Sequence, residues 1–217
     1  MIEPEWLDEA SPDKARDNLQ DLVRLNRHWG GHSSLGALLR RVAAPRGPCT
    51  ILDVGSASGD MGSEIARLWP NARVTSLDYV AHHLDDAPGP KLVGDAFRLP
   101  FAPQSFDYVF SSLLLHHFTD QQVVELLASF ANVARRAVLA VDLHRTPIPY
   151  HFVPATRFAL GWNPITVHDA PISVAAGWAP RELRALASAA GLRNPVVRTH
   201  GFAYRVTLYG EVNEPPR

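Results

Sequence analysis

The chain has 217 residues, of which 46% are hydrophobic and 20% are charged. This balance is typical of one globular domain and excludes an intrinsically disordered chain. Lys and Arg number 21 against 22 Asp and Glu, so the formal net charge is −1, and no basic cluster stands out. Nucleic acids and anionic membranes are therefore not expected as partners.

The cysteine content and the first residues of the chain indicate the cellular compartment. The single cysteine, Cys49, excludes disulfide frameworks and multi-cysteine metal sites. Residues 1–8 lack the cationic and apolar regions of a signal peptide, and no apolar run reaches 18 residues. We therefore expect a cytoplasmic protein without a membrane span.

Two helices are predicted before the first strand. Ser11-Pro12 can begin one helix, and Gly30-Gly31 would end it before a second helix at Ser34–Val42. Because both helices precede the sheet and two glycines join them, we expect residues 11–45 to form a helical lid.

Short apolar runs then alternate with helical stretches. Met61, Ile65 and Leu68 share one helical face, and Thr119–Gln122 has the capping-box pattern of a helix start. This alternation predicts an α/β fold with a doubly wound, Rossmann-like, seven-stranded sheet, mostly parallel, whose last strand is antiparallel because a hairpin is expected at Gly201. The strands are expected at 50–54, 73–77, 91–94, 108–113, 137–141, 195–200 and 203–209.

The whole chain, 1–217, is predicted to be one domain with four parts. The parts are the lid (11–45), a cofactor-binding core (46–144), an acceptor-side insert (145–178), and a C-terminal helix and hairpin (179–212). The insert carries an aromatic set that suits a planar apolar ligand or simply completes the core: Tyr150, Phe152, Phe158 and Trp162.

The loop after the first predicted strand indicates a ligand site. Gly55 can adopt the positive φ of a sharp strand exit, and Gly59 lets the backbone approach a ligand closely. The helix that follows presents unpaired N–H groups to an anionic group. Ala57 stands where a dinucleotide fingerprint requires glycine, so a nicotinamide or flavin cofactor is not supported.

Acidic residues fall at the ends of successive predicted strands. Asp53 lies within the first strand, Asp78 ends the second and Asp95 follows the third. A carboxylate at a strand tip can accept both hydroxyls of a ribose, and one at the next tip can accept from an exocyclic amine. Each acid alone is more often a loop cap, but their joint placement indicates a binding site.

These segments resemble the class I S-adenosylmethionine-dependent methyltransferases, in the ubiquinone/menaquinone-biosynthesis-like branch that acts on small molecules. The resemblance covers about residues 45–210, through ILDVGSASGD (51–60), VTSLD (74–78), GDAFRLPFAPQSFDYV (94–109) and LLLHHF (113–118). It implies S-adenosyl-L-methionine as the cofactor, with Asp78 at the ribose and Asp95 at the adenine. The implied cofactor-binding residues are Asp53, Gly55, Ser56, Gly59, Asp78, Tyr79, Asp95, Ala96, Ser111 and Ser112.

The segment His116–Asp120 is also similar to the His-Asp-Trp-Ser-Asp segment of plant-type small-molecule O-methyltransferases, whose first histidine is the general base. His116 is therefore the expected base, and His117 has the same chemistry one residue later. Because adjacent side chains of an extended segment point oppositely, at most one should face the pocket.

Other polar residues admit different interpretations. The histidines and acids His116, His117, Asp142 and His144 lack the spacing of ligands to one ion, and no metal site is expected. The pair His168-Asp169 is either an acid/base unit or a simple turn, and we favour the turn.

The expected function is methyl transfer from S-adenosylmethionine to a small acceptor. The aromatic insert favours a phenol, hydroquinone or polyketide, with O-methylation slightly preferred over C-methylation. The alternative is a catalytically inactive S-adenosylmethionine-binding partner or regulatory protein. Ser111, Ser112, His116 and His117, at the predicted position of the methyl group, favour an enzyme. A homodimer is left open.

Overall fold

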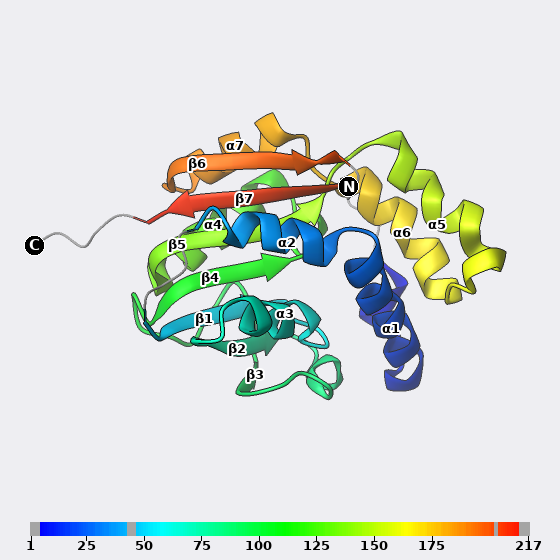
Figure 1. The fold of residues 1–217 in the computed structure, drawn as a ribbon, viewed down its shortest axis with the longest axis horizontal. Coiled ribbons are helices and arrows are strands. Elements are labelled where there is room, and N and C mark those ends of the chain that lie inside the picture. The colour runs from blue at the N-terminus through cyan, green and yellow to red at the C-terminus, as the bar shows by residue number, and fades with distance from the viewer. Residues whose placement is uncertain (1–4, 43–46, 202–203, 213–217) are drawn as a thin grey trace, which may run out of the picture.

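The computed structural model describes residues 5–42, 47–201 and 204–212. Its seven-stranded sheet has the order β3-β2-β1-β4-β5-β7-β6, and β7 runs antiparallel to both β5 and β6 while the other pairs are parallel (Figure 1). The predicted α/β sheet with an antiparallel last strand is confirmed; Ala203, the predicted start of that strand, lies outside the described residues. The strands are β1 (Cys49–Val54), β2 (Ala72–Asp78), β3 (Lys91–Val93), β4 (Phe106–Ser112), β5 (Ala134–Leu143), β6 (Arg193–His200) and β7 (Arg205–Glu211).

Helices cover both faces of the sheet, and short 3₁₀ turns lie before α1 and in two of the connections (Figure 1). The predicted capping box is confirmed, because the Thr119 hydroxyl accepts from the Gln122 N–H and the Gln122 side chain accepts from the Thr119 N–H. The helices are α1 (Pro12–His28), α2 (Gly31–Leu39), α3 (Asp60–Leu68), α4 (Asp120–Val133), α5 (Pro147–Leu160), α6 (Pro164–Ala176) and α7 (Pro180–Ala189), and the 3₁₀ turns are η1 (Trp6–Glu9), η2 (Ala81–Leu84) and η3 (Leu115–His117).

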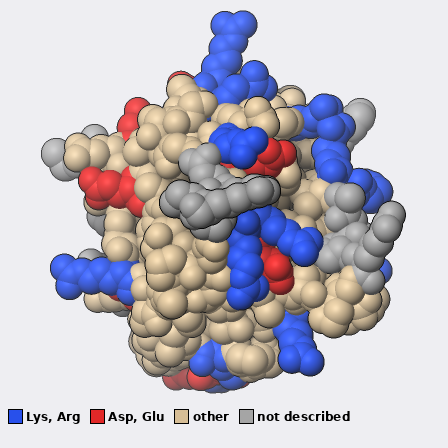
Figure 2. Space-filling view, turned by 90° about the vertical axis from the view of Figure 1, so that its left-hand side faces the viewer, with Lys and Arg blue, Asp and Glu red and all other residues tan. Residues whose placement is uncertain are grey.

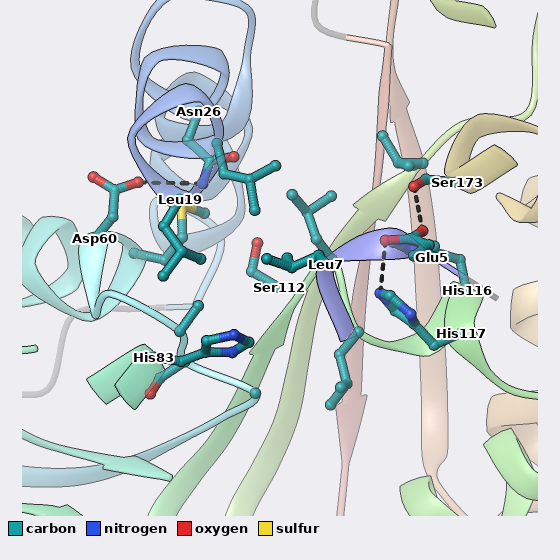
Figure 3. Close-up of a pocket in the computed structure, with 18 of the residues that line it drawn as sticks. Glu5, Leu7, Leu19, Asn26, Asp60, His83, Ser112, His116, His117 and Ser173 are labelled. Carbon is teal, nitrogen blue, oxygen red and sulfur yellow. Dashed lines mark hydrogen bonds and ion pairs between the residues drawn. The ribbon is translucent and has the colours of Figure 1, made fainter. Parts of the chain in front are cut away.

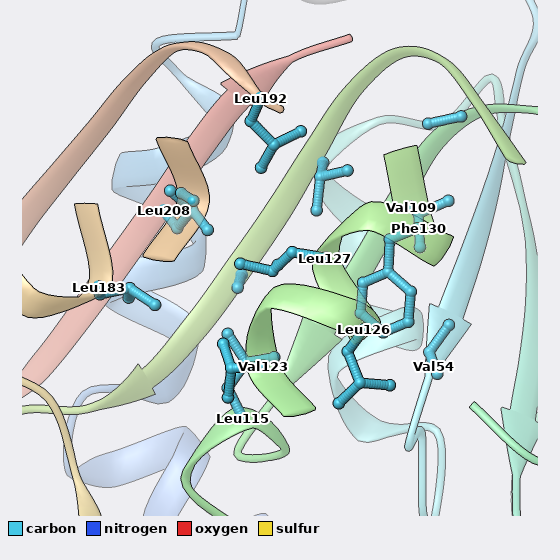
Figure 4. Packing of buried hydrophobic residues seen from close by; sticks show 14 of the residues in the cluster. Val54, Val109, Leu115, Val123, Leu126, Leu127, Phe130, Leu183, Leu192 and Leu208 are labelled. Carbon is cyan, nitrogen blue, oxygen red and sulfur yellow. The ribbon is translucent and has the colours of Figure 1, made fainter. Parts of the chain in front are cut away.

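A large apolar cluster fixes α4 and α7 on one face of the sheet (Figure 4). Leu126, Leu127 and Phe130 of α4 are fully buried there with Leu183 of α7. Burying a side chain of this size contributes about 1.5–3 kcal/mol. The sheet is therefore a rigid platform for the loops at its carboxyl end.

The predicted lid divides into two parts with different roles. Leu35 and Leu38 of α2 are buried against Ile51 of β1 and Ile65 of α3, so α2 belongs to the core and the lid prediction is wrong for it. Its apolar face meets the sheet because Gly30, at φ +106°, turns the chain between the two helices. Of the two helices of the predicted lid, α1 is the one beyond the sheet, and residues 43–45 are outside the described residues (Figure 1).

The predicted insert forms the hairpin of α5 and α6, which lies beside α1 at the carboxyl end of the sheet (Figure 1). Its aromatic residues do not act as one set. Phe152 lines the cavity described below, and Trp162 is buried against Trp29 at a centroid distance of 5.3 Å. Tyr150 and Phe158 are 41% and 87% exposed, so they neither line that cavity nor complete the core.

The edge at the amino ends of the parallel strands lies opposite this hairpin. Figure 2 shows Lys and Arg side chains there, dispersed among uncharged residues with acids between them. Arg135 and Arg136 lie 3.7 and 3.5 Å from the Asp107 carboxylate. Within the described residues, no helix is both long and apolar enough to cross a membrane.

Candidate active site

A cavity of about 750 Å³ lies at the carboxyl ends of the parallel strands (Figure 3). It is enclosed by α1, the α5–α6 hairpin and the N-terminal turn, which consists of Glu5 and η1. This is where ligands bind in open α/β sheets. Gly59 and Ser111 do not line it. The predicted residues that do are Asp53, Gly55, Ser56, Asp78, Tyr79, Asp95, Ala96, Ser112, His116 and His117.

The loop after β1 requires its glycines for two different reasons. Gly55 has φ +68°, and a Cβ there would lie 2.8 Å from the Leu114 side chain. Gly59, at φ +70°, packs so closely on Ala87 that a Cβ would lie 2.9 Å from its methyl group. Ala57 also has a positive φ, +46°, which costs an L-residue about 1–2 kcal/mol. Its N–H donates to the Asp78 carboxylate at 2.9 Å, which helps to hold that conformation.

Asp53 is a buried carboxylate on the wall of the cavity. It is 1% exposed, and neither oxygen meets the geometry of a hydrogen bond with any described residue. Burial, followed by the charges of Asp78 and Asp60, raises the pKa of Asp53 to about 7, and the nearby Gly62 N–H opposes this shift. Such a group is stabilised by a cation beside it, and the ammonium and sulfonium groups of S-adenosylmethionine are cations.

Asp78 ends β2 and Asp95 follows β3, as predicted. Asp78 accepts from the N–H groups of Ala57 and Val80, at 2.9 and 3.0 Å, one on each oxygen. Burial raises the pKa of Asp78, but the hydrogen bonds from His83 and these N–H groups outweigh it and lower the pKa. A carboxylate has about four lone-pair sites, so Asp78 keeps acceptor capacity for the ribose. These residues therefore fit the implied cofactor.

His116 and Asp142 form a buried pair at the other end of the cavity. His116 Nδ1 lies 2.7 Å from Asp142 Oδ1, and the Leu115 and Leu143 N–H groups also donate to this carboxylate, at 2.9 and 2.7 Å. The two side chains are 3% and 1% exposed. Asp142 thus fixes the ring of His116 and the proton on Nδ1.

The pKa of His116 is far from that of a free imidazole. Burial lowers it, but the charge and hydrogen bond of Asp142, followed by the nearby Glu5 carboxylate, raise it to about 9. At pH 7.5 only about 3% of such a group is neutral. The value of a free imidazole, near 6.5, therefore does not describe His116.

The prediction that only one of the two histidines faces the pocket is wrong. Residues 115–117 form the 3₁₀ turn η3 and not an extended segment, so both rings lie on one side, with centroids 4.4 Å apart. Glu5 faces both rings, with its oxygens 3.7 Å from His116 Nε2 and 3.9 Å from His117 Nε2 (Figure 3). The choice between His116 and His117 as the base must therefore depend on the groups that each ring contacts.

Sequence reasoning missed the contribution of the N-terminal turn and its partners. Glu5 lines the cavity and accepts a hydrogen bond from Ser173 of α6. His168 and Asp169 lie inside α6, so the predicted turn is wrong, and Asp169 accepts from two N–H groups of the N-terminal turn. These contacts join residues more than 160 positions apart, for which a single sequence carries no signal.

Helix α1 bridges the two ends of the cavity. Asn26 donates to Asp60 at the start of α3, at 3.2 Å (Figure 3). On the side of α6, Asn18 donates to the Thr166 hydroxyl at 2.9 Å, and Asp21 accepts from that hydroxyl at 2.9 Å and from the Asn163 N–H at 2.7 Å. The position of α1 is thus fixed by buried polar contacts.

Comparisons with known proteins agree with this geometry. A family model described as a methyltransferase domain matches residues 51–137. A demethylmenaquinone methyltransferase of Roseiflexus sp. (strain RS-1) is 28% identical over 197 residues, which are 82% of this chain and 79% of that protein.

Solved structures show the same fold. A S-adenosylmethionine-dependent methyltransferase from Aquifex aeolicus matches with a TM-score of 0.66 and 16% identity, over 94% of this chain and 100% of that one. Human N-acetylserotonin methyltransferase, in complex with S-adenosylmethionine, matches with a TM-score of 0.56 and 18% identity, over 75% of this chain and 47% of that one. The matching region, its glycine loop and the acids at the strand ends together support a class I S-adenosylmethionine-dependent methyltransferase.

Proposed function

We propose that the protein methylates a small aromatic acceptor, with the oxygen of a phenol or hydroquinone as the favoured nucleophile. The observation that carries this proposal is the buried His116–Asp142 pair at the wall of a largely apolar cavity. Trp29, Phe118 and Phe152 contribute aromatic surface to the same cavity. Two of the proteins compared above are named for demethylmenaquinone and for N-acetylserotonin, which supports a small acceptor.

The cofactor is assigned to the end of the cavity that carries the acids. Asp53 would balance the charge of its methionine part, Asp78 would accept from the ribose hydroxyls and Asp95 would accept from the adenine amine. S-adenosylmethionine supplies an electrophilic methyl group on a sulfonium. Ser112, which lines the cavity at the end of β4, would then lie between the cofactor and the histidines.

The protein contributes positioning, exclusion of water and a proton acceptor. Methyl transfer is an in-line displacement, so holding the acceptor oxygen in line with the methyl group supplies much of the rate. Helices α1 and α6 enclose the cavity and exclude water. His116 Nε2 would take the hydroxyl proton as the oxygen attacks, while Asp142 holds Nδ1–H and stabilises the resulting imidazolium.

Replacing Asp78 by Ala is expected to weaken binding of S-adenosylhomocysteine by about tenfold or more, because two hydroxyls lose a charged acceptor. Calorimetric titration of parent and variant measures this effect. Asp86→Ala, which changes an exposed acid, is the matched control and should bind as the parent does. Equal affinity in Asp78→Ala and the parent would contradict the ribose assignment.

Paired acceptors separate oxygen from carbon methylation. Each phenol or hydroquinone is offered with its fully methylated ether, in which every hydroxyl is blocked but the ring carbons remain. We expect labelled methyl from S-adenosylmethionine on the phenolic oxygen and no transfer to the ether. A product that keeps its free hydroxyl and gains a ring methyl group would contradict the preference for oxygen.

A further inference from the structure

The N-terminal turn places a carboxylate on the proposed base. Glu5 approaches both histidines of η3 at ion-pair distance, and its carboxylate accepts from the Ser173 hydroxyl (Figure 3). At 3.7 Å from His116 Nε2 it is too far for a strong hydrogen bond but close enough for a strong charge interaction. Glu5 also lines the cavity, so this carboxylate lies where an acceptor hydroxyl would approach the base.

A buried carboxylate of α6 fixes this turn. Asp169, which is 5% exposed, accepts from the Trp6 N–H at 3.0 Å on one oxygen and from the Leu7 N–H at 3.1 Å on the other. His168 Nδ1 lies 2.7 Å from the same carboxylate, and its ring stacks on Trp6 at a centroid distance of 3.7 Å. Two consecutive N–H groups bound to one carboxylate determine the direction in which the preceding residue, Glu5, enters the site.

The charged and titratable groups around His116 come from four parts of the chain. Asp142 on β5 is hydrogen-bonded to Nδ1 of His116, and Glu5 on the N-terminal segment faces its Nε2. His117 is the neighbouring ring within η3. Arg205 of β7 lines the cavity; burial lowers its pKa to about 10 while the charge of Asp142 opposes this shift. On α6, Asp169 contacts the turn and not the ring.

We propose that Glu5 is a further residue of the acceptor site, that Asp169 positions it, and that its carboxylate makes His116 a stronger base for a weakly acidic hydroxyl. A base of higher proton affinity takes a proton more readily from a weakly acidic hydroxyl, and a phenol has a pKa near 10. With two carboxylates beside it, His116 has a pKa of about 9 and approaches that value. This role of Glu5 rests on the proposed phenolic acceptor, whereas its effect on the proton affinity of His116 does not.

The proton affinity of His116 is measured directly, without turnover, by a pH titration of the histidine rings in ¹⁵N NMR spectra of the full-length protein. The His116 signal is assigned by its loss in His116→Gln. We expect a midpoint near pH 9 in the parent. Glu5→Gln, which keeps the shape but removes the charge, should lower the midpoint by about one unit or more.

Asp169→Asn tests the positioning role, because this residue does not contact the ring. One amide oxygen cannot hold both N–H groups as the carboxylate does, so the midpoint should fall in the same direction as in Glu5→Gln. Glu125→Gln, an exposed acid on α4, is the control and should leave the midpoint unchanged. Binding of S-adenosylhomocysteine should be the same in all four proteins.

Each outcome decides one part of the proposal. An unchanged midpoint in Glu5→Gln would overturn the role of Glu5. A shift in Glu5→Gln without a shift in Asp169→Asn would overturn the role of Asp169. The failure of every phenol as an acceptor would refute the proposed function but would leave the NMR result intact, so the two ideas fail separately.

Discussion

His116→Ala is expected to lower kcat by about 10²- to 10⁴-fold while leaving the affinity for S-adenosylhomocysteine within a few-fold of the parent value. The variant loses the proposed base, whereas Asp53, Asp78 and Asp95 at the proposed cofactor end are unchanged. In the parent, only the neutral form of His116 accepts a proton and its pKa is about 9, so kcat/KM should rise with pH up to about 9. In the variant this rise should be absent.

His117→Ala is the matched control for that experiment. Its ring lies beside that of His116 and faces the same carboxylate, but only His116 bonds the buried Asp142. We therefore expect His117→Ala to keep most of the activity. A large loss in His117→Ala with little loss in His116→Ala would assign the base to His117. Activity retained in both variants would mean that the acceptor ionises without a histidine.

Deleting residues 1–28 is expected to abolish turnover and to spare binding of S-adenosylhomocysteine. The deletion removes η1 and α1, which close the cavity over the acceptor end, whereas the two large apolar clusters of the core contain no residue of this segment. Water would enter the site and the acceptor would lose its position. Turnover assays and calorimetry on the purified truncated protein measure both effects.

A shorter deletion, of residues 1–10, separates the two elements. It removes Glu5 and the turn but keeps α1, whose contacts with Thr166 and Asp60 do not involve the deleted residues. We expect measurable turnover, and the rise of kcat/KM with pH should be displaced to lower pH. Full activity after deletion of residues 1–28 would place the acceptor pocket away from α1.

Local sequence patterns predicted the parts of the fold and site that short segments determine. The capping box at Thr119 and the acids after β2 and β3 depend on residues within a few positions of one another, so the sequence contains the information. The position of α2 could not be predicted from local sequence patterns. Its apolar residues suit a lid and a core helix equally, and only the packing on Ile51 and Ile65 distinguishes them.

The acceptor end was less predictable because its contacts are distant in the chain. Asp142 lies 26 residues after His116, and the anchor of the N-terminal turn, Asp169, lies 163 residues after Trp6. The direction of two adjacent histidines depended on whether η3 was a turn or a strand extension, and the sequence LLLHHF permits both. The electrostatics of His116 follow from these distant partners, so its raised pKa could not be predicted either.

The central claim is methyl transfer to a small phenolic acceptor, and one measurement tests it most directly. The purified full-length protein is examined by mass spectrometry for bound S-adenosylmethionine or S-adenosylhomocysteine. It is then incubated with methyl-labelled S-adenosylmethionine and a panel of phenols, hydroquinones and polyketides, beside His116→Ala. We predict a bound cofactor, a labelled methyl ether of at least one acceptor with one S-adenosylhomocysteine per product, and a loss of that product in the variant. A protein that binds the cofactor but labels no acceptor of the panel, or that labels one equally well without His116, would contradict this account.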